Sequence, residues 1–129
     1  MSSGMEMRRD GGYPGPRITG FSGRGFRLED TVFPGGVLLS PTEAWPWDDA
    51  PPPQALTLEA LGPLATYAPT PEFLLLGTGS GLIQPPRAFV RAMEARNIGV
   101  EVMDSRAAAR AWGVLRSEDR QVIAALMAL

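Results

Sequence analysis

The sequence predicts a single α/β domain in which a mixed β-sheet lies between layers of helix. Three observations point to this fold class. Short β-like segments fill residues 18–39, an apolar run at residues 73–76 is followed by a helical pattern and an alternating strand pattern at residues 98–102, and helical patterns complete the chain. A strand, a crossover helix and a second strand favour parallel pairing. We therefore expect an N-terminal antiparallel meander, a central βαβ unit and C-terminal helices.

The N-terminal part of the chain predicts a tail and then four strands. Residues 1–16 contain six glycines and prolines and few groups that could be buried, so we expect a disordered tail before a single domain at residues 17–129. Turn residues separate the β-like segments, which are rich in aromatic and β-branched side chains. The predicted strands of the meander span residues 18–21, 26–28, 31–33 and 37–39.

A proline-rich segment at residues 41–55 is expected to form a surface loop, because proline cannot donate to a β-ladder. It contains Trp45 and Trp47. Two interpretations of these tryptophans remain open. They pack the loop onto the domain, or they form part of an interface with another protein.

Capping residues and apolar spacing predict four helices. The first is capped by Thr57 and ends before the prolines at positions 69 and 71. The second begins at Pro85 or Pro86 and is closed by Asn97, and the third is capped by Asp104 or Ser105. A last helix is expected after Ser117, because residues 122, 123, 126 and 127 are apolar at helical spacing.

Glycines at positions 77, 79 and 81 follow the apolar strand, where α/β proteins often bind ligands. The segment is not a dinucleotide fingerprint, since Leu82 stands where the third glycine is needed, and it lacks the lysine of a P-loop. A methyltransferase-like loop is disfavoured because residues 82–84 separate the glycines from the next helix and the chain is short for that fold. A structural turn and a small-molecule or anion site both remain open. The crevice residues of the second interpretation are Gly77, Thr78, Gly79, Asp104, Ser105, Arg106 and Arg110.

The composition excludes several classes of function. The chain contains no cysteine, histidine or lysine, so it offers no thiolate or imidazole ligand for a metal and no Ser-His-Asp, Cys-His or Schiff-base chemistry. We expect neither a metal nor a cofactor. A net charge of −2 without a dense basic run disfavours nucleic acid. No apolar stretch approaches the roughly 20 residues that span a bilayer, so we expect a cytoplasmic protein.

Catalysis would depend on Glu101, Asp104 or Ser105, the acids and the hydroxyl nearest the glycine loop. Asp104 is first of all a helix cap, and backbone donors at a helix start stabilise the ionised carboxylate. A carboxylate held in its ionised form is a poor proton shuttle at neutral pH. We therefore expect a protein that is not an enzyme.

Several motifs occur together in one order. They are Leu-Leu-Leu-Gly-Thr-Gly at 74–79, Val-Glu-Val-Met-Asp-Ser at 100–105, Glu-Asp-Arg-Gln-Val-Ile-Ala-Ala-Leu at 118–126, Ile-Thr-Gly-Phe-Ser-Gly-Arg-Gly-Phe at 18–26, Pro-Gly-Gly-Val-Leu at 34–38 and Trp45. Together they resemble the assembly factor three family of respiratory complex I, the NADH:ubiquinone oxidoreductase. This small domain-of-unknown-function family has largely uncharacterised bacterial members.

The resemblance implies a compact α/β domain with a mixed sheet and no established catalytic activity. It also implies a protein partner, which could be a respiratory-chain subunit or another inner-membrane-associated protein that holds the chain at the membrane periphery. Ser105, Ala109, Trp112 and Gly113 stand where the family often has threonine, cysteine, tyrosine and asparagine. The leading expectation is a non-catalytic interaction or assembly protein that uses Trp45, Trp47 and the rim of the glycine loop. The alternative is a small-molecule or anion-binding domain at Gly77–Gly79 and Asp104.

Overall fold

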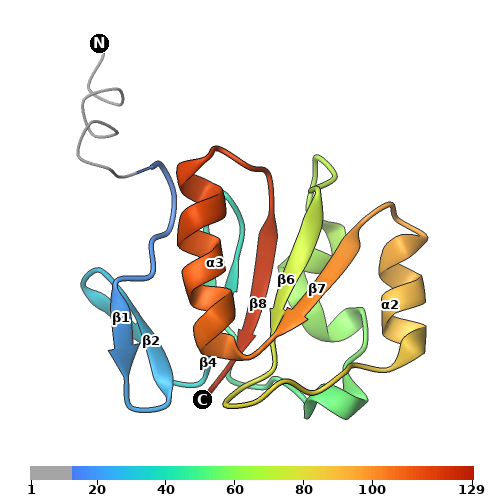
Figure 1. Cartoon of the computed structure of the whole chain (residues 1–129), viewed down its shortest axis with the longest axis horizontal. Helices are drawn as coiled ribbons and strands as arrows, with labels where there is room; N and C mark the ends of the chain where they lie inside the picture. The colour runs from blue at the N-terminus through green and yellow to red at the C-terminus, as the bar shows by residue number, and fades with distance from the viewer. Residues whose placement is uncertain (1–12) are drawn as a thin grey trace.

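A computed structural model describes residues 13–129, which form two β-sheets, two α-helices and two short 3₁₀ segments (Figure 1). The predicted disordered tail falls largely on residues 1–12, which lie outside the described residues. Residues 13–16 already contact the domain, because the indole Nε1 of Trp112 donates to the carbonyl oxygen of Pro16 at 3.1 Å. Contacts with the domain thus begin before the predicted boundary at residue 17.

The N-terminal sheet is an antiparallel meander of three strands, β1 (Gly20–Ser22), β2 (Gly25–Leu28) and β3 (Thr31–Phe33). The fourth predicted strand, β4 (Gly36–Leu39), does not continue the meander. All four residues of β4 are buried, and a strand covered on both faces belongs in the interior of a larger sheet. The prediction of a four-stranded meander is therefore wrong in its last strand.

The second sheet is mixed and has five strands in the order β5-β4-β8-β6-β7. Its remaining strands are β5 (Ala44–Pro46), β6 (Phe73–Gly77), β7 (Gly99–Met103) and β8 (Ile123–Met127). Strand β6 runs parallel to β7 and β8, whereas β4 is antiparallel to β5 and β8. Helix α2 (Arg87–Glu94) connects β6 to β7, which confirms the predicted βαβ unit.

The last predicted helix is wrong, because the residues concerned form the central strand β8. Helix α3 (Ser105–Ser117) continues through the position expected to cap a new helix, and Asp119 then takes a left-handed conformation with φ of 61°. All five residues of β8 are buried. A strand buried on both faces is apolar at every position, so it also satisfies the spacing of a helix.

The proline-rich segment is more ordered than a surface loop. It contains the edge strand β5 and the 3₁₀ turn η1 (Pro53–Ala55). Pro46 lies in β5, where an edge strand tolerates a missing donor. The helix predicted after Thr57 is a second 3₁₀ segment, η2 (Glu59–Thr66), which Gly62 interrupts with φ of 56° just before Pro63.

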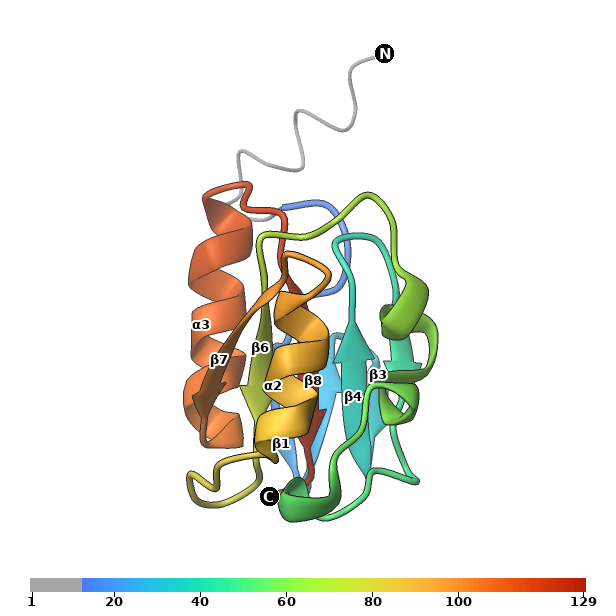
Figure 2. The same cartoon turned by 90° about the vertical axis from the view of Figure 1, so that its right-hand side faces the viewer.

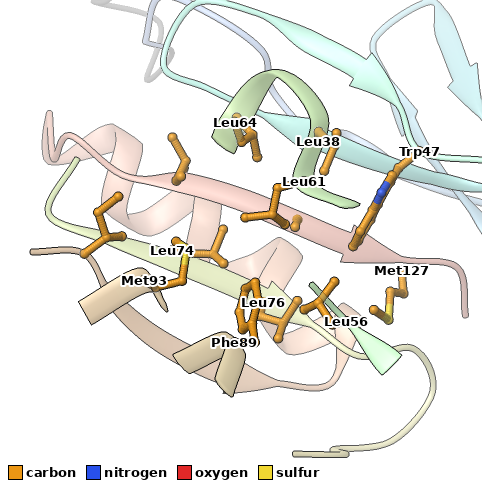
Figure 3. Close-up of a cluster of buried hydrophobic side chains, with 13 residues drawn as sticks. Leu38, Trp47, Leu56, Leu61, Leu64, Leu74, Leu76, Phe89, Met93 and Met127 are labelled. Atoms are coloured by element: carbon orange, nitrogen blue, oxygen red, sulfur yellow. The ribbon is translucent and has the colours of Figure 1, made fainter. Parts of the chain in front are cut away.

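The core fills both faces of the five-stranded sheet. Figure 2 shows α3 on one side of the sheet and the η1–η2 segment on the other. On the η2 side, Leu74, Leu76 and Ile123 pack with Phe89 and Met93 of α2 and with the leucines of η2 (Figure 3). On the α3 side, the buried residues are Phe26, Leu28, Val37, Leu39, Leu75, Ala108, Ala109, Trp112, Val122, Ala124 and Leu126. The N-terminal sheet therefore closes the α3 layer, and both faces are covered.

Candidate functional site

The glycine loop begins at the end of β6, where the chain passes very close to the start of α3. A Cβ at Gly77 would lie 2.8 Å from the Oγ and 2.9 Å from the Cα of Ser105, and 3.0 Å from Leu126. Such contacts are shorter than carbon atoms allow, so only glycine lets β6 and α3 approach this closely. The glycine at position 77 is explained by packing between elements.

Gly79 and Ser105 exchange hydrogen bonds across the same junction. The N–H of Gly79 donates to Ser105 Oγ at 2.8 Å, and the N–H of Ser105 donates to the Gly79 carbonyl at 2.8 Å. The Ser105 hydroxyl in turn donates to the carbonyl of Met127 at 2.7 Å. Gly79 has φ of 96°, which glycine adopts without the steric cost of a side chain. Ser105 therefore ties the loop to the end of β8.

Thr78 folds the loop back on itself. Its N–H donates to the carbonyl of Met103 at 3.0 Å, and its hydroxyl donates to the Gly81 carbonyl at 2.6 Å while accepting from the N–H of Ile83 at 3.0 Å. Both polar groups of Thr78 are thus occupied within the protein. The side chain is 4% exposed, and its hydroxyl already has both a donor and an acceptor partner within the protein.

Asp104 caps α3, as predicted from the sequence. Its Oδ1 accepts a hydrogen bond from the N–H of Ala107 at 2.9 Å. Five of the predicted crevice residues, Gly77, Thr78, Gly79, Asp104 and Ser105, therefore meet at one junction. The N–H groups of Thr78 and Gly79 and the hydroxyls of Thr78 and Ser105 are all bonded inside the protein.

The two arginines of the predicted crevice lie elsewhere on α3. The guanidinium carbon of Arg106 is 4.8 Å from the centre of the Phe21 ring in β1, a distance at which a cation is attracted to an aromatic face. Arg110 lines a groove between α3 and β1. Neither side chain is turned to the glycine loop, so the predicted grouping of seven residues divides into two parts.

The two tryptophans of the proline-rich segment have different environments. Trp47 is 2% exposed, and its Nε1 donates to the carbonyl of Ala60 at 2.9 Å. Figure 3 shows its ring among the leucines of the core. Trp45 is half-buried against the same cluster. Packing of this segment onto the domain is therefore its structural role, and Trp47 offers no surface to a partner.

A hollow of about 460 Å³ opens beside the glycine loop at the carboxyl ends of β6 and β8. Thr78, Met127 and Ala128 form one wall, and residues 50–53 form the opposite one. Arg24 and Asp48 bring opposite charges to the rim. The Nε of Arg24 also donates to the carbonyl of Leu129 at 2.6 Å, and the N–H of Leu129 donates back to Arg24 O at 2.8 Å.

Arg24 and Asp48 were not predicted as site residues. One lies in a turn of the N-terminal sheet and the other follows Trp47, so nothing in the linear sequence brings them together. Among residues 13–129 no group of three or more histidine, cysteine, aspartate or glutamate side chains could hold a metal ion. No helix in the described part of the chain is long and apolar enough to cross a membrane.

Comparison with other proteins gives the chain a family. A model of a protein family of unknown function, DUF498/DUF598, matches residues 18–127. The chain is 32% identical over 120 residues to an uncharacterized protein of Rhodobacter capsulatus, which covers 92% of this chain and 90% of the relative.

Solved structures share the fold. A crystal structure of a Bordetella parapertussis protein matches with a TM-score of 0.79 at 28% identity, over 90% of this chain and 98% of that one. A Bartonella henselae protein, described as an outer membrane protein, matches with a TM-score of 0.79 at 30% identity, over 91% of this chain and 98% of that one. The single α/β domain with its mixed sheet is thus common to these proteins, and the chain belongs to the DUF498/DUF598 family.

Proposed function

We propose that this protein is a non-catalytic interaction protein that acts in the assembly of a larger complex. The observation that carries the proposal is the use of the glycine loop's polar groups. The N–H groups of Thr78 and Gly79 and the hydroxyls of Thr78 and Ser105 all bond to protein atoms. These hydrogen bonds join the loop to α3 and to the ends of β7 and β8, so the groups that make them are not available to a ligand. This arrangement favours a scaffold over a site for phosphate or an oxyanion.

The side chains nearest the loop also support a role without catalysis. Asp104 is engaged as a helix cap and Ser105 as a bridge to β8. Glu101 lies exposed on the edge strand β7, with no histidine, cysteine or lysine in the chain to act beside it. Large apolar side chains are instead exposed on the surface at Phe21, Leu82 and Val114, at 36%, 56% and 58%. Exposed apolar side chains indicate a surface that meets other proteins where they lie together in one patch.

The resemblance to complex I assembly factors suggests the class of partner. We propose a respiratory-chain subunit or another protein associated with the inner membrane, met by this chain from the cytoplasmic side. The partner would then hold this chain at the membrane.

The proposal is tested by capturing the protein with its neighbours in the native cell. A tagged chain expressed at its natural level is crosslinked and purified, and the crosslinked peptides are identified by mass spectrometry. An unrelated protein of similar size that carries the same affinity tag is the control. We expect one or a few respiratory or inner-membrane subunits in every replicate, joined through the surface of this domain. Recovery of the chain alone, or of partners that the control also recovers, would contradict the proposal.

A second candidate function is supported by the hollow beside the loop. Its volume of about 460 Å³ lies within the usual range of small-molecule sites, and it occupies the edge of the sheet where α/β proteins bind ligands. A thermal-shift screen of nucleotides, S-adenosylmethionine and phosphorylated metabolites tests this function. A ligand at a hundred times its dissociation constant adds about 2.7 kcal/mol to the free energy of unfolding. The shift should vanish in Arg24→Gln and persist in Arg27→Gln, and no shift with any compound would exclude the candidate.

A further inference from the structure

A groove runs between strand β1 and helix α3, at the flank of the buried face of α3, to which Ala109 belongs. Its volume is about 270 Å³. Thr19, Gly20 and Phe21 line one wall, and Ala109, Arg110 and Gly113 line the other. Figure 1 shows β1 beside the lower half of α3. The groove is therefore a junction between the edge of the small sheet and a helix.

Each wall contains a glycine that no neighbouring atom requires. A Cβ at Gly20 or at Gly113 would meet nothing within 4 Å. Neither residue has a positive φ, so the backbone does not demand glycine either. Glycine inside a helix or a strand weakens it relative to alanine. These two residues reduce stability without improving packing, and what they do provide is open space on both sides of the groove.

Strand β1 presents an edge to the groove. In the described residues β1 pairs with β2 only, and it is the outer strand of the order β1-β2-β3. Unpaired backbone groups on such an edge can pair with an added strand. Phe21 in the wall of the groove is 36% exposed, and Val114, which follows Gly113 in α3, is 58% exposed.

Arg110 lines the groove, and Arg106 lies over the ring of Phe21 at one of its walls. Arg106 and Arg110 are both exposed on α3. The ion pairs found within residues 13–129 join Arg17 to Glu29 and Arg120 to Glu72, so neither of these two arginines is paired there. Charge complementarity therefore favours an occupant with a carboxylate, which arginine binds with two parallel hydrogen bonds.

We propose that this groove binds an extended segment of a partner protein, in which an acidic residue meets Arg106 or Arg110 and a neighbouring apolar side chain enters between Gly20 and Gly113. This inference rests on the proposed function, because it names the chemistry of the partner that an interaction protein would engage. The mode of binding is addition of a strand along β1, with α3 as the second wall.

Short random peptides displayed on phage are the probe. After selection on the full chain, the peptides are synthesised with a fluorescent label and binding is measured by fluorescence anisotropy. We expect selected peptides to share an acidic residue beside a large apolar one, to weaken at higher salt, and to lose at least about tenfold in affinity when the acid is replaced by its amide.

Substitutions in the groove locate the binding. Arg110→Glu reverses a charge, and Gly113→Leu fills the open space while giving α3 a better helix former. Each should weaken binding by at least about tenfold, and Gly113→Leu should not lower the melting temperature, since leucine favours a helix more than glycine does. Arg91→Glu on α2 is the matched control and should change affinity less than about twofold.

Three results would overturn the inference. The selection yields no peptide, the selected peptides bind the groove variants and the unsubstituted protein with equal affinity, or the protein self-associates in sedimentation experiments and Arg110→Glu abolishes this self-association. The last result would mean that a second copy of the chain occupies the groove. If crosslinking recovers a stable partner whose binding is unchanged in Arg110→Glu and Gly113→Leu, the inference fails while the proposed function stands. If no partner is recovered but peptides bind in the groove, the proposed assembly role is wrong, while the inference that the groove binds an extended peptide stands.

Discussion

Ser105 is the residue at which the glycine loop, α3 and β8 meet. Replacing it with alanine would leave the N–H of Gly79 and the carbonyl of Met127 without their hydrogen-bond partner in a fully buried position. Each buried group left unpaired costs about 1–3 kcal/mol. We expect Ser105→Ala to lower the free energy of unfolding by about 2–4 kcal/mol, measured by urea denaturation.

Ser117→Ala is the control for this measurement. Ser117 is exposed at the end of the same helix, and its hydroxyl bonds the carbonyl of Val114 at 2.7 Å. Loss of this local bond should change stability by less than about 0.5 kcal/mol. Equal midpoints for Ser105→Ala and Ser117→Ala would show that the Ser105 bridge does not hold the junction together.

Gly77 and Gly81 lie four residues apart in one loop and differ in what surrounds them. A Cβ at Gly77 would clash with Ser105 at 2.8 Å, whereas a Cβ at Gly81 would meet nothing within 4 Å. Gly77→Ala should therefore cost about 1–3 kcal/mol through overpacking. Gly81→Ala should stay within about 0.5 kcal/mol of the original chain. Comparable losses in both variants, measured by thermal unfolding, would contradict this assignment of roles.

At the scale of residues, the sequence predicts which groups gather at the loop but not what they bond. Asp104 is identified as a cap because an acid precedes an apolar helical pattern, a signal carried by neighbouring residues. The partner of Ser105 could not be identified, because the Met127 carbonyl reaches it only when residues 123–127 form a strand beside β6. The sequence pattern predicts a helix for those residues, so the hydrogen bond from the Ser105 hydroxyl to Met127 could not be predicted.

At the scale of elements, Glu72 and Arg120 join the start of β6 to the chain that follows α3. Two nitrogens of Arg120 donate to Glu72 Oε1 at 2.9 and 2.6 Å, and the N–H of Gln121 donates to Oε2 at 3.1 Å. Hydrogen bonds from Arg120 and from this backbone group hold the pKa of the Glu72 carboxyl below its ordinary value. Because the folded-state pKa is depressed, the contribution to stability is present at neutral pH and is lost as the pH falls through that pKa.

We therefore expect Glu72→Gln to destabilise the domain near pH 7, and to have no such effect once the pH has fallen below the lowered pKa of the Glu72 carboxyl and that carboxyl is protonated. The pair is exposed, so added salt should reduce the effect. Arg120→Gln should return the pKa of Glu72 toward its ordinary value in an NMR titration. If the difference between the original chain and Glu72→Gln does not depend on pH, the pair has no stabilising role.

The elements themselves differ in how far the sequence predicts them. Helix α2 and strands β6 and β7 carry clear signals, since prolines precede the helix and alternation marks β7. The sequence of strand β8 gives a misleading signal. Strand β8 is covered on both faces and is therefore apolar at every position. Ser117 and Glu118 also resemble the start of a helix, although they lie at the end of α3.

At the scale of the whole molecule, β8 is the strand on which both halves of the core depend. Ile123 and Met127 point into the cluster that contains Trp47, while Ala124 and Leu126 point into the cluster that contains Trp112. The α/β class was predicted from the order of local patterns. The central place of β8 was not, because it arises from pairing with β4 and β6, which lie far away in the sequence.

This arrangement predicts that the two clusters unfold together. In the variant Trp45→Phe with Trp112→Phe, Trp47 alone reports on the η2 side, and in Trp45→Phe with Trp47→Phe, Trp112 alone reports on the α3 side. Tryptophan fluorescence and far-UV circular dichroism should give one midpoint within each protein, as in a two-state transition. Ile123→Val, on the η2 side, should lower the free energy of unfolding by about 0.5–1.5 kcal/mol. The fluorescence of Trp112, on the opposite side, should report the same decrease. A Trp112 transition that Ile123→Val leaves unmoved would mean that the two layers melt separately and that β8 does not couple them.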